Sequence, residues 1–421
     1  MLRSQIQKHV KKKIRKRWLL FNAKDFQSLM YPCFIFGHIS GIFPYKINTS
    51  TFEISKPHCI LSTMIICVYC VFYLVLIHSI IISGTITYGD VPRDLEAVGY
   101  FTLTGLAVIA THLWSVPRMG LLQTILEISS KLSLKSYQKL SRFIHLKDIL
   151  CTILLIVQMS MYFSKEQALE VNCFTILIMA YDMYLALVML HMNMLYINCV
   201  CILTACFKEI NNNLMHMKGT LINNMELSIS SLMCHVQRDQ FFLIKLKTVM
   251  QQHLIITRTV QMLNTIFGLQ LLATIFGFFS EFTFELYFYV VHWQQKLHFS
   301  IDWHFLDVFV IQVAHYSAKI MLLVWACETG KTEAQKISTT IYDVLNSTSD
   351  KQIKAELHTF SLQILHCKNT FSAKGLTVDA TLLTAILGSV TTHMLILIQF
   401  LITTHSCDEK SGSNITINSV T

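Results

Sequence analysis

Charged residues are scarce in this chain, and their scarcity excludes a soluble globular protein. Asp, Glu, Lys and Arg make up 14% of the 421 residues, whereas hydrophobic residues make up 53%. A soluble domain carries roughly 25% charged residues, so a soluble chain of this composition could not cover its surface with polar groups. The composition therefore predicts an integral membrane protein, and its long apolar runs predict an all-α one.

Proline and the common enzyme motifs are also lacking. The five prolines all lie at or before position 117, so the later apolar segments have none to kink them. The sequence contains no phosphate-binding loop, dinucleotide-binding motif or kinase motif. Most of the 13 cysteines lie in apolar runs, where Cys acts as a small apolar residue, and the 18 histidines show no metal-ligand spacing. We expect no enzyme, catalytic residue, cofactor or metal ion.

The N-terminal segment is basic, with the sequence Lys-Lys-Lys-Ile-Arg-Lys-Arg at residues 11–17. No apolar core with a small-residue cleavage site follows it, so it does not read as a secretory signal. A polybasic stretch can bind nucleic acid. Beside a membrane domain it favours the anionic cytoplasmic leaflet, at about 1 kcal/mol per basic residue. We therefore expect membrane lipids, and no nucleic acid, as its partner.

Seven apolar segments are long enough to cross a bilayer, which takes a helix of about 20 residues. The fourth and fifth are longer than a bilayer requires, so they are expected to tilt or to continue into the cytosol as helices. The predicted spans are residues 57–83, 98–116, 146–164, 172–205, 263–291, 303–326 and 377–402.

The basic residues between these spans predict their direction. Residues 1–56 hold eleven Lys and Arg, and the loops 117–147, 206–262 and 327–376 hold six each, whereas every alternate segment holds one. Because basic loops stay in the cytosol, the N-terminus is expected inside the cell. After seven spans, the C-terminus is expected outside.

Two amphipathic helices are predicted in the last cytoplasmic loop. Apolar residues recur there at helical spacing, and the run Asn-Ser-Thr-Ser-Asp at 346–350 separates the two helices. Their apolar stripes need a partner, which is either the extensions of spans four and five, other subunits or the membrane surface. The stripes consist of Ile337, Ile341 and Val344, then Ile353, Leu357, Phe360 and Ile364.

Acidic and aromatic side chains gather near the external ends of spans four to six. Ionisable groups at membrane depth are candidates for a functional site, and carboxylates among aromatic rings suit a small polar ligand. His315 is expected either to line this site or to form an interhelical hydrogen bond, and Lys319 to snorkel to the cytosolic interface. The candidate ligand-binding residues are Asp182, Tyr181, Tyr184, Glu281, Phe282, Glu285, Trp303, Asp307, Gln312 and His315.

The end of the last span carries a recognisable pattern. Thr392, an apolar run from Met394 to Ile398, and Gln399-Phe400 resemble the signature that closes insect gustatory receptors, which is Thr-Tyr, five apolar residues and Gln-Phe. His393 stands at the Tyr position. The segment 371–379, Phe-Ser-Ala-Lys-Gly-Leu-Thr-Val-Asp, resembles the family's approach to its last span. The segment 41–45, Gly-Ile-Phe-Pro-Tyr, is weakly similar to its N-terminal Gly-x-x-Pro segment.

The resemblance implies a gustatory receptor in the plasma membrane of sensory neurons, acting as a non-selective cation channel that an external tastant opens. It implies a homo- or heterotetramer with other gustatory receptors, in which the last helix lines the pore. Gln399 and Phe400 would form the gate, and Thr392 and His393 would face the path. Met394, where sugar-class members tend to carry Glu, leans toward the fructose-type and bitter-type branches. Since imidazole titrates near neutral pH, His393 predicts pH-sensitive gating if its ring faces water.

Two alternatives remain open at this stage, a seven-span receptor that signals through a cytosolic partner and a membrane enzyme. The enzyme would need His paired with Asn or Asp at membrane depth, and no convincing pair is found.

The only sequon expected outside the cell is Asn414, since those at Asn48 and Asn346 face the cytosol. The predicted divisions are a cytoplasmic basic segment (1–56), spans one to six with their extensions (57–326), anchor helices (327–376), a pore-lining helix (377–402) and an extracellular tail (403–421).

Overall fold

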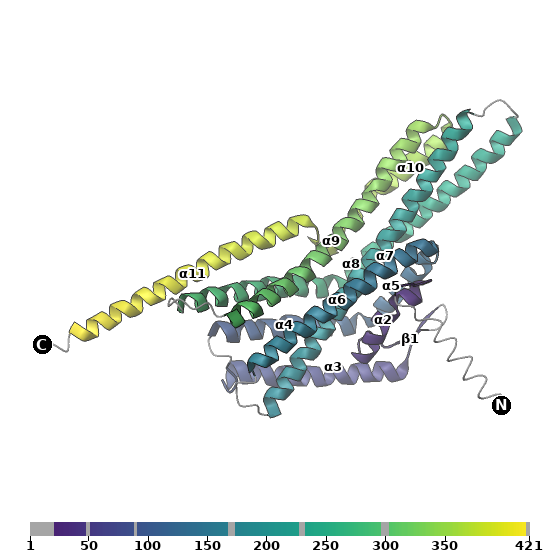
Figure 1. Ribbon diagram of the computed structural model, residues 1–421. Helices are drawn as coiled ribbons and strands as arrows, with labels where there is room; N and C mark the ends of the chain where they lie inside the picture. Colours follow the sequence, from purple (N-terminus) through teal and green to yellow (C-terminus); the bar gives the residue numbers. More distant parts are fainter. Residues whose placement is uncertain are drawn as a thin grey trace, which may run out of the picture.

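The computed structural model describes residues 21–47, 51–87, 91–166, 173–226, 232–295 and 303–417. Helices dominate these residues, and two short hairpins accompany them (Figure 1). In chain order the elements are α2 (Phe26–Ile39), β1 (Tyr45–Ile47), β2 (Phe52–Ile54), α3 (Lys56–Ile77), a π-helical turn (His78–Ile82), α4 (Val91–Leu113), α5 (Ser115–Ser129), α6 (Leu134–Glu166), α7 (Cys173–Glu226), α8 (Leu232–Gln295), α9 (Trp303–Ser347), α10 (Lys351–His366), β3 (Ser372–Ala373), β4 (Leu376–Thr377) and α11 (Ala380–Ile417).

The predicted spans coincide with helices. Among the described residues, six helices are long and apolar enough to cross a membrane, and they fall on every predicted span except the third. The third, residues 146–164, lies within α6, which packs against α7 and α9 in the same bundle. The predicted all-α membrane architecture is confirmed, and six of the seven predicted spans fall on helices that are long and apolar enough to cross a membrane.

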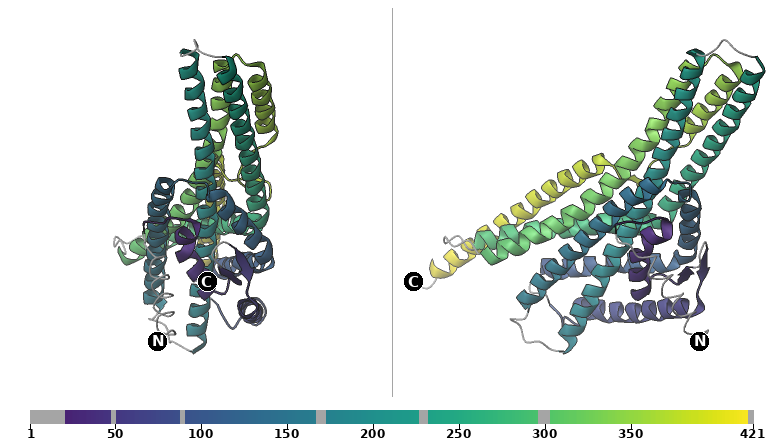
Figure 2. Two further views of the ribbon diagram at one scale, coloured as in Figure 1. Left: turned by 90° about the vertical axis from the view of Figure 1, so that its right-hand side faces the viewer. Right: turned by 45° about the vertical axis from the view of Figure 1, so that its right-hand side comes forward.

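Three helices are much longer than a membrane span requires. The 54 residues of α7 extend over about 80 Å at 1.5 Å per residue, whereas the hydrocarbon core is about 30 Å thick. Figures 1 and 2 show the ends of α7, α8 and α9 projecting together with α10 as one bundle. The predicted helical extensions of spans four and five are confirmed.

The projecting bundle has its own apolar core, as the two stripes predict. Ile337 and Ile341 of α9 and Leu357 and Phe360 of α10 are completely buried. The first predicted anchor helix is the C-terminal part of α9, which continues without interruption and ends at Ser347. Asp350 then caps α10, because its side chain accepts hydrogen bonds from the backbone N–H groups of the first turn.

The N-terminal elements fold onto the bundle, which the prediction of a basic cytoplasmic segment did not include. Asp25 and Ser28 form a capping box that starts α2. The strands β1 and β2 pair as an antiparallel hairpin, and Phe34 of α2 meets Phe43 and Phe52 edge-on at 5.6 Å between ring centroids. These buried rings join α2 and the hairpin to the rest of the core.

Candidate functional site

The two deepest acidic residues of the predicted ligand site come together in the structure. Asp182 of α7 and Glu281 of α8 lie within electrostatic range of each other. Asp182 is hydrogen-bonded to Tyr100 of α4, and Glu281 accepts a hydrogen bond from Tyr316 of α9. Four helices thus each bring one polar side chain to the same part of the bundle.

Further charged groups extend this site. Glu285 and Glu96 lie within electrostatic range of Glu281. The Nζ of Lys319 lies 5.6 Å from the centroid of the Tyr316 ring and within electrostatic range of Glu281. The predicted snorkelling of Lys319 is therefore wrong, because carboxylates inside the bundle attract its ammonium group. We call this group the carboxylate cluster, which comprises Glu96, Tyr100, Asp182, Glu281, Glu285, Tyr316 and Lys319.

Sequence reasoning missed the contribution of α4 and α6 to the cluster. Glu96 and Tyr100 are four residues apart, a spacing that places both on one face of α4. That spacing was a usable signal, but the predicted span began at residue 98 and left Glu96 outside. From α6, Gln158 donates a hydrogen bond from Nε2 to the Tyr316 hydroxyl at 3.4 Å.

Three predicted ligand residues have aromatic or backbone partners instead. Tyr181 stacks on Tyr69 of α3, with 5.4 Å between the ring centroids. The Tyr184 hydroxyl donates a hydrogen bond to the carbonyl of Ser40, just after α2, at 3.0 Å. Phe282 stacks on the phenylalanine one turn before it, at 5.6 Å between centroids. Tyr181 and Tyr184 thereby join α7 to the N-terminal third of the chain.

The candidates on α9 lie in different environments. Asp307 is exposed and Gln312 is half-buried, and the Trp303 side chain lies outside the described residues. His315 is 1% exposed, and its Nε2 has no hydrogen-bond partner among the residues that the structure describes. The alternative expectation for His315, an interhelical hydrogen bond, is therefore not met at this nitrogen.

The polar groups of α11 are bonded within their own helix. Thr392 donates from Oγ1 to the Gly388 carbonyl at 2.9 Å. The Nδ1–H of His393 donates to the Ser389 carbonyl at 2.8 Å, and the His393 ring meets Phe279 of α8 edge-on at 5.3 Å between centroids. Because these donors are satisfied locally, the polarity of α11 does not by itself require a water-filled path.

One face of α11 is nonetheless uncovered. Gln399 is exposed, and the side chains of Phe400 and Asn414 lie outside the described residues. The helix continues to Ile417, past the predicted end of the span at 402. Among the described side chains of this helix, the large apolar ones that are exposed are Leu387, Leu395 and Ile396, at 59%, 58% and 44%.

The segment before α11 forms the turn that Gly375 predicts. The strands β3 and β4 pair antiparallel around the two residues Lys374 and Gly375, whose φ angles are +50° and +97°. A two-residue hairpin turn with φ positive at both positions favours Gly. The prediction of a turn with positive φ at Gly375 is confirmed.

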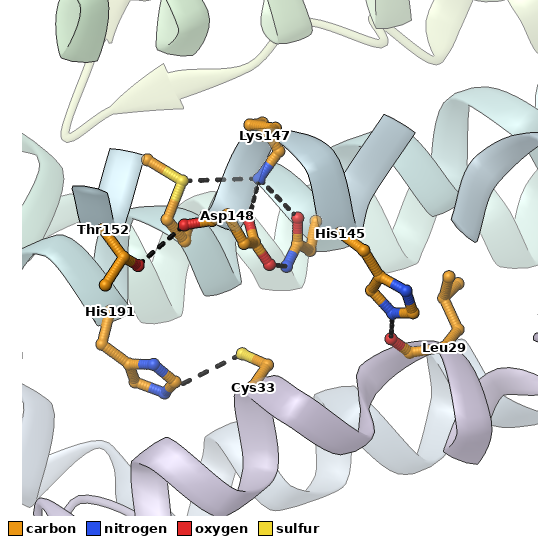
Figure 3. A network of polar contacts seen from close by, with 9 residues as sticks. Leu29, Cys33, His145, Lys147, Asp148, Thr152 and His191 are labelled. Atoms are coloured by element: carbon orange, nitrogen blue, oxygen red, sulfur yellow. Dashed lines mark hydrogen bonds and ion pairs between the residues drawn. The ribbon is translucent and has the colours of Figure 1, made fainter. Parts of the chain in front are cut away.

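A second polar network fastens α6 to α7 (Figure 3). The Lys147 ammonium group contacts the carboxylate of Asp148 and donates to Asn198 Oδ1 at 2.8 Å. Asn198 donates in turn to Asp148 Oδ2 at 3.0 Å. The Lys147 side chain is 3% exposed and that of Asp148 24%. Lys147 lies where the predicted loop 117–147 meets the predicted span 146–164, and no spacing in the sequence points to Asn198.

Histidines hold α2 against this region, as Figure 3 also shows. His145 donates a hydrogen bond from Nε2 to the Leu29 carbonyl at 2.9 Å. Its Nδ1 accepts a hydrogen bond from the Phe21 N–H at 3.1 Å. Since Nδ1 faces a donor, the ring carries its proton on Nε2. Nearby, the sulfur of Cys33 lies 3.8 Å from Nε2 of His191. Both contacts dock α2 on the spanning helices.

Comparison with known proteins gives matches in sequence and in fold. A protein named as gustatory receptor 28a of Drosophila melanogaster is 32% identical over 117 residues, which are 28% of this chain and 26% of that protein. Gustatory receptor 28b of the same organism is 29% identical over 155 residues, 36% of this chain and 33% of that protein. The matched region thus spans only a quarter to a third of these curated relatives.

The fold matches a solved receptor over nearly its whole length. The insect olfactory receptor OR5 from Machilis hrabei superposes with a TM-score of 0.68 at 12% identity, over 89% of this chain and 98% of that one. Its complex with eugenol gives a TM-score of 0.66. Residues 30–404 match the family of 7tm chemosensory receptors. The chain therefore belongs to the 7tm chemosensory receptor family.

Proposed function

We propose that this multi-pass membrane protein is a gustatory receptor that acts as a ligand-gated, non-selective cation channel. The observation that carries the proposal is the carboxylate cluster, because charged groups at membrane depth are costly and mark functional sites. The α9 helix, which contributes Tyr316 and Lys319, continues without a break to Gly330, which lies against Phe371 just before the β3–β4 hairpin. Membership of the chemosensory family supports the receptor role.

The cluster suits a small polar ligand that donates hydrogen bonds. Ionised carboxylates accept and do not donate, so a ligand seated beside Asp182 and Glu281 must offer hydroxyl or ammonium groups. The rings of Tyr181 and Phe282 would cover its apolar faces. We assign Asp182 and Glu281 the central role, and Glu285 and His315 a supporting one.

The pore would form around α11 when four subunits assemble, as the same chain or with other gustatory receptors. Four Phe400 rings would make an apolar gate that excludes water, and the Gln399 amides would replace part of the hydration of a passing ion. The exposed face of α11, with Leu387, Leu395 and Ile396, is the part of the helix that other subunits would cover. Thr392 and His393 would line the path below the gate.

The proposal includes an orientation, with the N-terminus in the cytosol and Asn414 outside. The basic segment before residue 21 would then contact anionic lipids of the inner leaflet. Treatment of the expressed protein with an endoglycosidase tests this directly. We expect Asn414→Gln to abolish any shift in mobility, whereas a shift that depends on Asn346 would overturn the orientation.

Whole-cell recording tests the channel itself. The chain is expressed alone, and then with a second gustatory receptor, in cells that lack sensory G proteins. D-fructose, sucrose, caffeine and quinine serve as probes. Ligand-evoked cation current is the expected result. Absence of current in both settings despite normal surface delivery would favour the alternative, a receptor that signals through a cytosolic partner.

A further inference from the structure

The β3–β4 hairpin and its flanking residues, which we call the joint, contact both α8 and α9 before the chain enters α11. Asn264 of α8 donates from Nδ2 to the Thr370 carbonyl at 2.8 Å, and its Oδ1 accepts from the Ser372 N–H at 3.2 Å. The side-chain amide of Asn264 thus holds this segment through both its NH2 group and its oxygen. At Gly268, also on α8, an added Cβ would lie 3.2 Å from the backbone nitrogen of Lys374. The absence of a side chain at Gly268 lets the turn lie directly on α8.

On its other side the joint contacts α9. A Cβ at Gly330 would lie 2.6 Å from the Phe371 ring, and that ring is 2% exposed. The next residue, Lys331, donates from Nζ to Asp379 Oδ2 at 3.3 Å. The two side chains are 27% and 17% exposed, so the ion pair is partly shielded from solvent. It connects α9 to the residue that immediately precedes α11.

Asp379 uses its two carboxylate oxygens for different purposes. Oδ1 accepts hydrogen bonds from the backbone N–H of Thr381 at 3.1 Å and from its hydroxyl at 2.5 Å, so it caps α11. Oδ2 accepts from Lys331. The Asp379 carboxylate therefore caps the N-terminus of α11 and also connects that N-terminus to α9.

The same α9 reaches the carboxylate cluster. Lys319 lies 12 residues before Lys331 in this continuous helix, which is about 18 Å at 1.5 Å per residue. No proline interrupts the helix, so a shift of α9 at the cluster moves Lys331 with it.

We propose that the Lys331–Asp379 ion pair is a positioning contact for gating, through which α9 sets the position of the first turn of α11. The inference rests on the proposed channel function, since it concerns how the cluster and the last helix communicate. A contact that serves only stability would change the amount of channel at the surface. A positioning contact changes the balance between closed and open channels.

A double-mutant cycle separates these roles. Asp379→Asn removes the charge but keeps a good helix cap, since Asn caps as well as Asp, and Lys331→Gln removes the other charge. Each is expected to move the half-maximal concentration of the most effective probe about threefold to tenfold in the same direction. The double variant should move it no further than the larger single change.

Two variants serve as controls. Lys331→Arg keeps a cation beside Asp379 and should respond like the wild type. Lys336→Gln breaks a different ion pair, the one with Glu333 at 2.7 Å within α9 itself, and should leave the half-maximal concentration unchanged. The ratio of basal to maximal current is recorded for every variant, because that ratio does not depend on the number of channels at the surface.

The outcomes distinguish the inference from the function on which it rests. Shifts that multiply in the double variant, or a wild-type response from Asp379→Asn in both readouts, overturn the positioning role and leave the channel proposal intact. No evoked current from the wild type, despite surface delivery and a partner receptor, overturns both. A non-multiplying double variant together with a silent Lys336→Gln supports the pair as a gating contact.

Discussion

Removing the counter-charge of the buried Lys147 should destabilise the protein more than removing Lys147 itself. The lysine side chain is 3% exposed, whereas that of Asp148 is 24% exposed. Asp148→Asn leaves a buried ammonium group without its carboxylate, which costs about 3–5 kcal/mol. Lys147→Met leaves a carboxylate that water reaches and that Asn198 still binds, so the cost is about 1–2 kcal/mol. The chemically milder substitution should therefore do the greater damage.

The midpoint of heat-induced aggregation in detergent, followed by size-exclusion chromatography, ranks these variants. The double variant Lys147→Met/Asp148→Asn should recover most of the loss of Asp148→Asn, because it buries no unpaired ammonium group. Lys336→Met is the control, since its ion pair with Glu333 is largely exposed on the lysine side and should contribute at most about 1 kcal/mol. Equal losses from the two single variants would refute the argument that burial sets the cost.

The ligand site and the hairpin turn each give a further expected outcome. Asp182→Asn should raise the half-maximal concentration of an effective tastant about tenfold or more at normal surface expression. Asp307→Asn, at an exposed site, should not raise it. An unchanged dose–response curve for Asp182→Asn would remove Asp182 from the site. Gly375→Ala, at φ +97°, should lower the thermal midpoint through a loss of about 1 kcal/mol or more, whereas Gly388→Ala, in open space within a helix, should not lower it.

The features that sequence predicted are those set by the bilayer and by local chemistry. Span positions followed from hydropathy, because the bilayer fixes how many apolar residues a helix needs. The buried stripe through Ile337 and Leu357 followed from helical spacing. The turn at Gly375 followed from the conformational freedom of glycine. Each of these needs only the residue and its near neighbours in the chain.

The features that sequence did not predict depend on which helices become neighbours. The spacing of residues in the sequence shows which side chains share one face of a helix, but not which neighbouring helix that face packs against. Lys147 and Lys319 lie near the predicted ends of spans and were therefore expected at loops and interfaces, yet carboxylates in the structure hold both of them inside the protein. Glu96 likewise belongs to the cluster only because α4 packs against α8.

Polar groups at membrane depth divide into two kinds in this protein. Thr392 and His393 satisfy their donors on carbonyls one turn earlier in α11, so their presence follows from helix geometry alone. Asp182 and Glu281 cannot do this, since a carboxylate has no proton to donate to a carbonyl and takes its hydrogen bonds from Tyr100 and Tyr316 on other helices. The second kind therefore holds the bundle in a particular arrangement, and a ligand that competes for those carboxylates changes the free energy of that arrangement. We therefore propose the carboxylate cluster, more than the polarity of the last helix, as the place where ligand binding and helix position are linked.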